Sequence, residues 1–133
     1  MNRPEFAVLG AVSLGGAVGS MARYGISRWL PTHSGHFPWA TFIVNVVGCL
    51  LIGVLMVLVT EVFDAHRLVR PFLGVGILGG FTTFSAYAVD FTSLVDVGEP
   101  AVAFGYLFAT LAAALVAVVA GMAATRAVAG GRQ

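Results

Sequence analysis

The 133-residue chain is poor in charged residues: Asp, Glu, Lys and Arg make up 10% of it, and lysine is absent. A soluble domain carries about 25% charged residues, so this composition argues against an ordinary soluble enzyme. The seven arginines form no basic run, which argues against nucleic-acid binding. The single cysteine, Cys49, cannot form an intrachain disulfide.

Four stretches contain no Asp, Glu, Lys or Arg, and together they hold 83 of the 133 residues: 6–22, 39–60, 71–89 and 101–125. A bilayer core about 30 Å thick needs about 20 apolar residues per helix. The sequence therefore predicts an all-α membrane protein that forms a single domain over residues 1–133. Its four transmembrane helices are expected at about 5–29, 39–60, 71–95 and 101–125.

Four short helices cannot enclose a sizeable polar path alone, because every lipid-facing side chain must be apolar. The length therefore predicts an oligomer. An even number of spans puts both termini on one side of the membrane, with five arginines there and two on the other side. By the positive-inside rule, this distribution favours a cytoplasmic N-terminus. The two groups are Arg3, Arg67, Arg70, Arg126 and Arg132 against Arg23 and Arg28.

The third predicted span contains Gly79 and Gly80 followed closely by Thr82 and Thr83. Such a run weakens a helix, and irregular backbone at membrane depth exposes carbonyls that suit a small hard cation such as Na⁺. Alternatively, the glycines let another helix approach closely and the helix stays continuous. The adjoining threonines favour a broken third helix.

Two further spans carry polar side chains four residues apart, which puts each pair on one helix face. Thr41 and Asn45 form the first pair, and Tyr106 and Thr110 form the second. Such groups either bond between helices, at about 1 kcal/mol each, or donate hydrogen bonds to a passing anion. The residues alone leave both roles open.

Two charges and two aromatic rings have similarly open roles. Arg23 and Asp90 follow uncharged runs, so each either snorkels at a helix end or stands at the mouth of an aqueous vestibule. Phe84 and Tyr87 share a helix face. They either pack in the usual way or hold a small anion with their positive ring edges.

Three motifs, in matching order and spacing, resemble those of the CrcB/Fluc family of fluoride channels. They are residues 15–24 (GGAVGSMARY), 41–48 (TFIVNVVG) and 79–85 (GGFTTFS). The resemblance covers all four spans. It implies a channel that exports fluoride passively from the cytoplasm across the cell membrane. It also implies an antiparallel, dual-topology dimer with two pores and a structural Na⁺ at the dimer centre.

Carried over to this sequence, the resemblance implies that the backbone carbonyls of Gly79 and Thr82 bind the Na⁺, together with those of the partner chain. Arg23 and Asp90 match vestibule positions. Tyr87 stands where the family commonly has a second phenylalanine. The implied fluoride path contains Asn45, Thr41, Phe84, Tyr87, Ser85, Thr83, Tyr106 and Thr110.

Other functions are weighed against this one. A small multidrug-type transporter needs an acidic residue inside a span, but Glu5 precedes the first uncharged stretch and none of the four contains one. A non-conducting membrane assembly subunit remains a second alternative. No catalytic constellation lies at membrane depth, so an enzyme is not expected. The partner chain is either an identical copy or a related subunit, because the arginine asymmetry leaves a pair of fixed orientation open.

Overall fold

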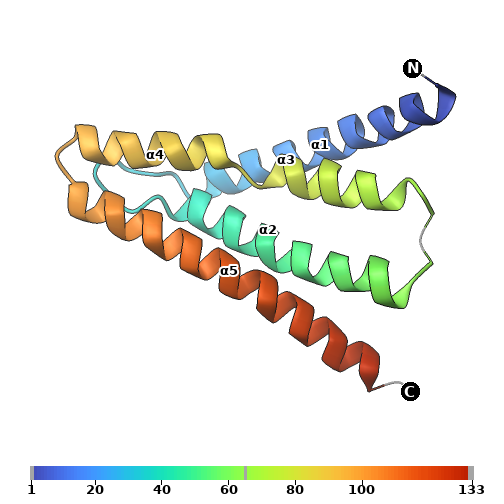
Figure 1. Ribbon diagram of the computed structural model, residues 1–133. Helices are drawn as coiled ribbons and strands as arrows, with labels where there is room; N and C mark the ends of the chain where they lie inside the picture. The colour runs from blue at the N-terminus through green and yellow to red at the C-terminus, as the bar shows by residue number, and fades with distance from the viewer. Residues whose placement is uncertain (1, 65, 132–133) are drawn as a thin grey trace.

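The computed structural model describes residues 2–64 and 66–131, and all regular structure among them is helical (Figure 1). Four helical segments are long and apolar enough to cross a membrane, which confirms the predicted four-span, all-α class. The last extends beyond its predicted end. In chain order, the elements are α1 (Arg3–Trp29), α2 (Trp39–Val57), the π-helical η1 (Leu58–Val62) and η2 (Pro71–Leu78), α3 (Gly79–Phe81), α4 (Phe84–Asp96) and α5 (Pro100–Gly130).

The helices pack as two pairs. Figure 1 shows α5 alongside α2, and α1 alongside η2 and α3, and among the described residues these elements share the most extensive contacts. The start of α1 and the end of α5 lie at the same end of the bundle as the end of η1 and the start of η2. The short connections explain this arrangement, because they force neighbouring spans to run antiparallel.

The third span changes its backbone conformation at two residues. Thr82 has φ −76° and ψ 154°, and Thr83 has φ −149° and ψ 124°, so both are extended between the end of α3 and the start of α4. Thr83 is the N-cap of α4, and its Oγ1 accepts a hydrogen bond from Ala86 N at 3.1 Å. Threonine is a favoured N-cap residue, so the sequence itself supports a new helix start here.

Glycines bring the first and third spans into backbone contact. A Cβ atom at Gly19 would overlap the Ile77 carbonyl oxygen and the Phe81 nitrogen, and one at Gly80 would overlap the Gly16 backbone. Small residues are the usual means by which membrane helices approach this closely. Close approach and extended backbone, treated as alternatives from the sequence, therefore occur together in one span.

Substitution of Gly19 tests this packing. Gly19→Ala places a methyl group against the Ile77 carbonyl, so we expect a loss of about 1–3 kcal/mol from overpacking. Thermal unfolding in detergent measures the loss as a lower midpoint. Gly10→Ala is the matched control on the same helix, because a Cβ there has no neighbour within 4 Å and alanine favours the helix. Equal midpoints for the two variants would contradict the close packing.

Candidate functional site

The extended residue Thr83 is held by a side chain from α2. Asn45 Nδ2 donates to Thr83 O at 3.0 Å, and Thr83 N donates to Asn45 Oδ1 at 2.8 Å. Both backbone groups of Thr83 are thus bonded to one amide, which faces them as a neighbouring strand would. An unpaired backbone group at membrane depth would cost several kcal/mol, so this pairing accounts for how the extended segment is tolerated.

The same pairing diverts two donors from the helical hydrogen-bond pattern. In a continuous α-helix, Thr83 N would donate to Gly79 O, and Ala86 N would donate to Thr82 O. Here Thr83 N donates to Asn45, and Ala86 N donates to Thr83 Oγ1. The carbonyls of Gly79 and Thr82 therefore lose their helical donors. Carbonyl oxygens released in this way are suitable ligands for a small hard cation.

A cavity of about 360 Å³ lies beside the extended segment. It brings together three predicted site residues: Arg23 from α1, Thr41 from α2, and Thr83. A guanidinium group beside hydroxyl groups offers several hydrogen-bond donors, so this cavity can accept an anion. Its lining is Ser20, Arg23, Tyr24, Ser27, Thr41, Val44, Thr83 and Ala86.

The prediction missed three residues of α1 that line this cavity: Ser20, Tyr24 and Ser27. Ser20 Oγ donates to Gly80 O at 3.4 Å, and Ser27 Oγ donates to Arg23 O at 3.0 Å. The signal was present in the sequence, because residues 20, 23, 24 and 27 recur at the spacing of one helix face.

Two buried tyrosines connect α4 and α5. Tyr87 donates from its hydroxyl to Leu107 O at 2.7 Å, and the fully buried Tyr106 donates to Asp90 Oδ2 at 3.4 Å. The hydroxyl that distinguishes Tyr87 from a phenylalanine is therefore bonded to the α5 backbone.

The two aromatic residues predicted for the path have different surroundings. Phe84 and Tyr87 have ring centroids 5.8 Å apart, but Phe84 is 79% exposed whereas Tyr87 is 5% exposed. Ser85 is also exposed, and its Oγ lies 3.3 Å from Thr83 Oγ1. Within one chain, Phe84 and Ser85 thus face outward at the start of α4.

Thr110 stands out among the polar side chains of α5. It is 4% exposed, and its Oγ1 has no hydrogen-bond partner among the described residues. A buried hydroxyl left unpaired costs about 1–3 kcal/mol, so such a group calls for an explanation. It lies one helical turn from Tyr106, on the face that α5 buries.

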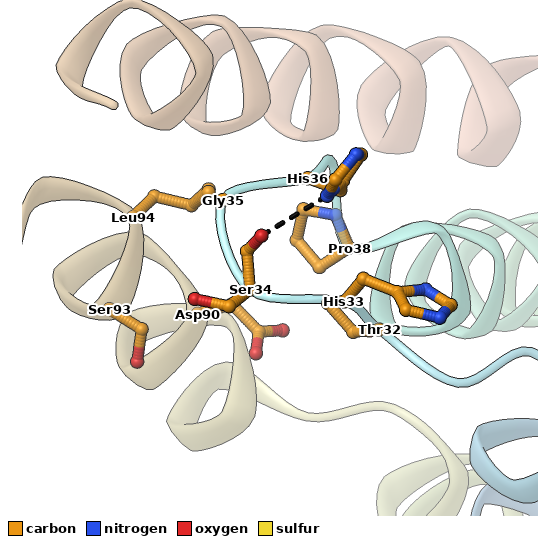
Figure 2. A pocket seen from close by; sticks show the side chains of 9 residues that line it. All are labelled: Thr32, His33, Ser34, Gly35, His36, Pro38, Asp90, Ser93 and Leu94. Atoms are coloured by element: carbon orange, nitrogen blue, oxygen red, sulfur yellow. Dashed lines mark hydrogen bonds between the residues drawn. The ribbon is translucent and has the colours of Figure 1, made fainter. Parts of the chain in front are cut away.

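Asp90 lines a separate cavity of about 340 Å³, shown in Figure 2. Asp90 and Ser93 of α4 form one side of it, and the loop before α2 forms the other. In that loop, His36 Nδ1 lies 3.1 Å from Ser34 O, and Gly35 has a φ of 76°, which favours glycine. Arg23 and Asp90, the two predicted vestibule residues, therefore line different cavities.

Comparison with known proteins shows the family to which the chain is similar. The family model described as "CrcB-like protein, Camphor Resistance (CrcB)" matches residues 10–122. The Nocardia farcinica protein named fluoride-specific ion channel FluC 2 is 58% identical over 120 residues, covering 90% of this chain and 86% of that protein. A Rhizobium johnstonii protein named fluoride-specific ion channel FluC is 45% identical over 119 residues, covering 89% of this chain and 95% of that protein.

The Tyr87 hydrogen bond leads to a prediction about stability. Tyr87→Phe removes the bond to Leu107 O but keeps the buried ring, so we expect a loss of about 1 kcal/mol. Tyr24→Phe is the control, because Tyr24 is 66% exposed. Thermal unfolding in detergent should show a lower midpoint for the Tyr87 variant only, and equal midpoints would argue against the bond.

Proposed function

The chain belongs to the CrcB family, and we propose that fluoride enters it through the cavity lined by Arg23, Thr41 and Thr83. The protein is a fluoride-specific ion channel of the cell membrane and not an enzyme. The observation that carries this proposal is the set of hydrogen-bond donors in that cavity, drawn from three different parts of the fold. Passive export of fluoride from the cytoplasm through such a path would reduce fluoride toxicity.

The chemistry of fluoride matches these donors. Fluoride is small and strongly hydrated, so a path must replace its water with hydrogen-bond donors. Arg23 attracts the anion into the cavity, and hydroxyl groups then take over without a fixed charge that would hold it too tightly. Further along, the unpartnered hydroxyl of Thr110 gains an acceptor when fluoride passes. The edges of Phe84 and Tyr87, with Ser85, Asn45 and Tyr106, complete the proposed path.

We propose that two identical chains form the channel as an antiparallel, dual-topology dimer. The exposure of Phe84 supports this, because a ring that is 79% exposed in one chain can border a polar path only if a second chain covers it. The small size of the four-helix chain supports it as well. The alternative is a heterodimer with a related subunit, which the arginine asymmetry leaves open.

A structural Na⁺ is proposed at the centre of this dimer, not transported. The carbonyls of Gly79 and Thr82 would hold it, joined by the same pair from the second chain. The fit is supported by the diverted donors, since the N–H groups that would pair with these two carbonyls bond elsewhere. When bound, the cation would balance the carbonyl dipoles and join the two interrupted spans.

Fluoride efflux from liposomes that contain this chain alone tests the proposed assembly. We expect rapid passive efflux without a proton gradient, measured with a fluoride-selective electrode. Efflux only after addition of a related subunit would favour the heterodimer. Proton-coupled export of a cationic drug, or the absence of any flux, would contradict the channel and favour the multidrug-type transporter or the assembly subunit.

Thr110→Val tests the path in the same assay. Valine matches threonine in shape and removes only the unpartnered hydroxyl, so the unfolding midpoint should stay the same or rise. Efflux should fall about tenfold, the equivalent of one lost hydrogen bond to the ion. Thr125→Val is the control on the same helix, because Thr125 Oγ1 donates to Gly121 O at 2.7 Å and should not serve fluoride. Equal efflux from both variants would contradict a role for Thr110 in the fluoride path.

Removal of Na⁺ tests the central site. Protein purified and reconstituted with N-methylglucamine in place of Na⁺ should lose fluoride efflux and unfold at a lower temperature. Return of Na⁺ should restore both, because the ligands belong to the fold itself. Undiminished efflux in the complete absence of Na⁺ would contradict a structural cation.

A further inference from the structure

A helix that stops inside a membrane creates unpaired backbone groups, and each must find a partner nearby. Around the interruption in the third span, Thr82 N donates to Leu78 O at 2.9 Å, and Ala86 N donates to Thr83 Oγ1 at 3.1 Å. These bonds lie within the span itself. Both backbone groups of Thr83, in contrast, are bonded to a residue of α2 that lies 38 positions earlier.

Asn45 is well suited to this task because its side chain carries an acceptor and a donor at the spacing of a peptide group. Its Oδ1 accepts from Thr83 N at 2.8 Å, and its Nδ2 donates to Thr83 O at 3.0 Å. The bond to Thr83 O uses one of the two N–H groups on Nδ2, so the other N–H group is not used by Thr83. Most of the hydrogen-bonding capacity of the amide is thus engaged with protein backbone.

The next turn of α2 fits the same segment. A Cβ atom at Gly48 would overlap Thr82 Cγ2, so the absence of a side chain at position 48 makes room for the Thr82 methyl group. Asn45 and Gly48 are three residues apart and therefore lie on one face of α2. Together they accommodate the extended segment, because Asn45 hydrogen-bonds to Thr83 and Gly48 leaves space for Thr82.

We propose that Asn45 is a positioning residue, which acts on the fluoride path by holding the third span open at Thr82 and Thr83. By taking the Thr83 N–H, it keeps Gly79 O free of its helical donor. It also holds Thr83 in the geometry in which Thr83 Oγ1 caps α4 and lines the cavity of Arg23. The part that concerns the carbonyls rests on the proposed Na⁺ site.

Asn45→Leu tests the proposal, because leucine branches at the same carbon as asparagine and its side chain cannot hydrogen-bond. Amide hydrogen exchange of the reconstituted full chain is measured at Thr83, together with fluoride efflux as a function of Na⁺ concentration. We expect exchange at Thr83 to accelerate at least about tenfold. We also expect half-maximal efflux to need about tenfold more Na⁺. Thr41→Val, one turn away on the same helix face, should leave exchange at Thr83 unchanged.

Other results would overturn the proposal. If Asn45 serves only as a donor to fluoride, Asn45→Leu will reduce efflux while exchange at Thr83 and the Na⁺ dependence stay as in the parent protein. If efflux from the parent protein does not depend on Na⁺, that result would instead contradict the proposed Na⁺ site. The exchange measurement would still decide the role of Asn45.

Asn45→Asp keeps the proposal testable if the leucine variant does not fold. Aspartate retains an oxygen that accepts the Thr83 N–H and loses the amide donor to Thr83 O. We therefore expect exchange at Thr83 to remain within about threefold of the parent protein. Exchange accelerated by about tenfold or more in this variant would contradict the positioning role.

Discussion

Within a bilayer, backbone N–H and C=O groups have to be paired by protein, and this requirement governs the structure around Thr82 and Thr83. The side-chain amide of Asn45 pairs with the N–H and C=O groups of Thr83, and the Thr83 hydroxyl pairs with the N–H group of Ala86. Neighbouring features fit this arrangement. Gly48 leaves space for Thr82, α4 begins at a defined residue, and the cavity of Arg23 is bordered by the extended backbone.

The distribution of polar groups suits a channel for a small hard anion. The charged donor, Arg23, lines a cavity at one helix face, whereas the buried polar side chains are the hydroxyl-bearing Tyr87, Tyr106 and Thr110. A fixed charge deep in the path would hold fluoride, whereas neutral donors can replace its water and release it. Phe84 faces outward, so the proposed path is incomplete without a second chain.

Much of the fold could be predicted from the sequence, and the exceptions have physical causes. Uncharged runs predicted four spans, because a bilayer excludes charge over a fixed thickness, and the even number of spans predicted both termini on one side. The glycines of the third span allowed two interpretations. Gly80 turned out to lie against Gly16 while the neighbouring threonines are extended. Ser20 and Ser27 were missed as cavity residues, although their spacing with Arg23 puts them on one helix face.

By itself, the sequence determined the spans, the family and the residues on each helix face, because these follow from local composition and helical periodicity. Only the tertiary structure decided which faces meet. It paired Asn45 with Thr83, directed the Tyr87 hydroxyl to Leu107 O, left the Thr110 hydroxyl without a partner, and separated Arg23 from Asp90. These outcomes depend on the rotation and depth of each helix against its neighbours, which side-chain packing and backbone hydrogen bonding set across the whole bundle.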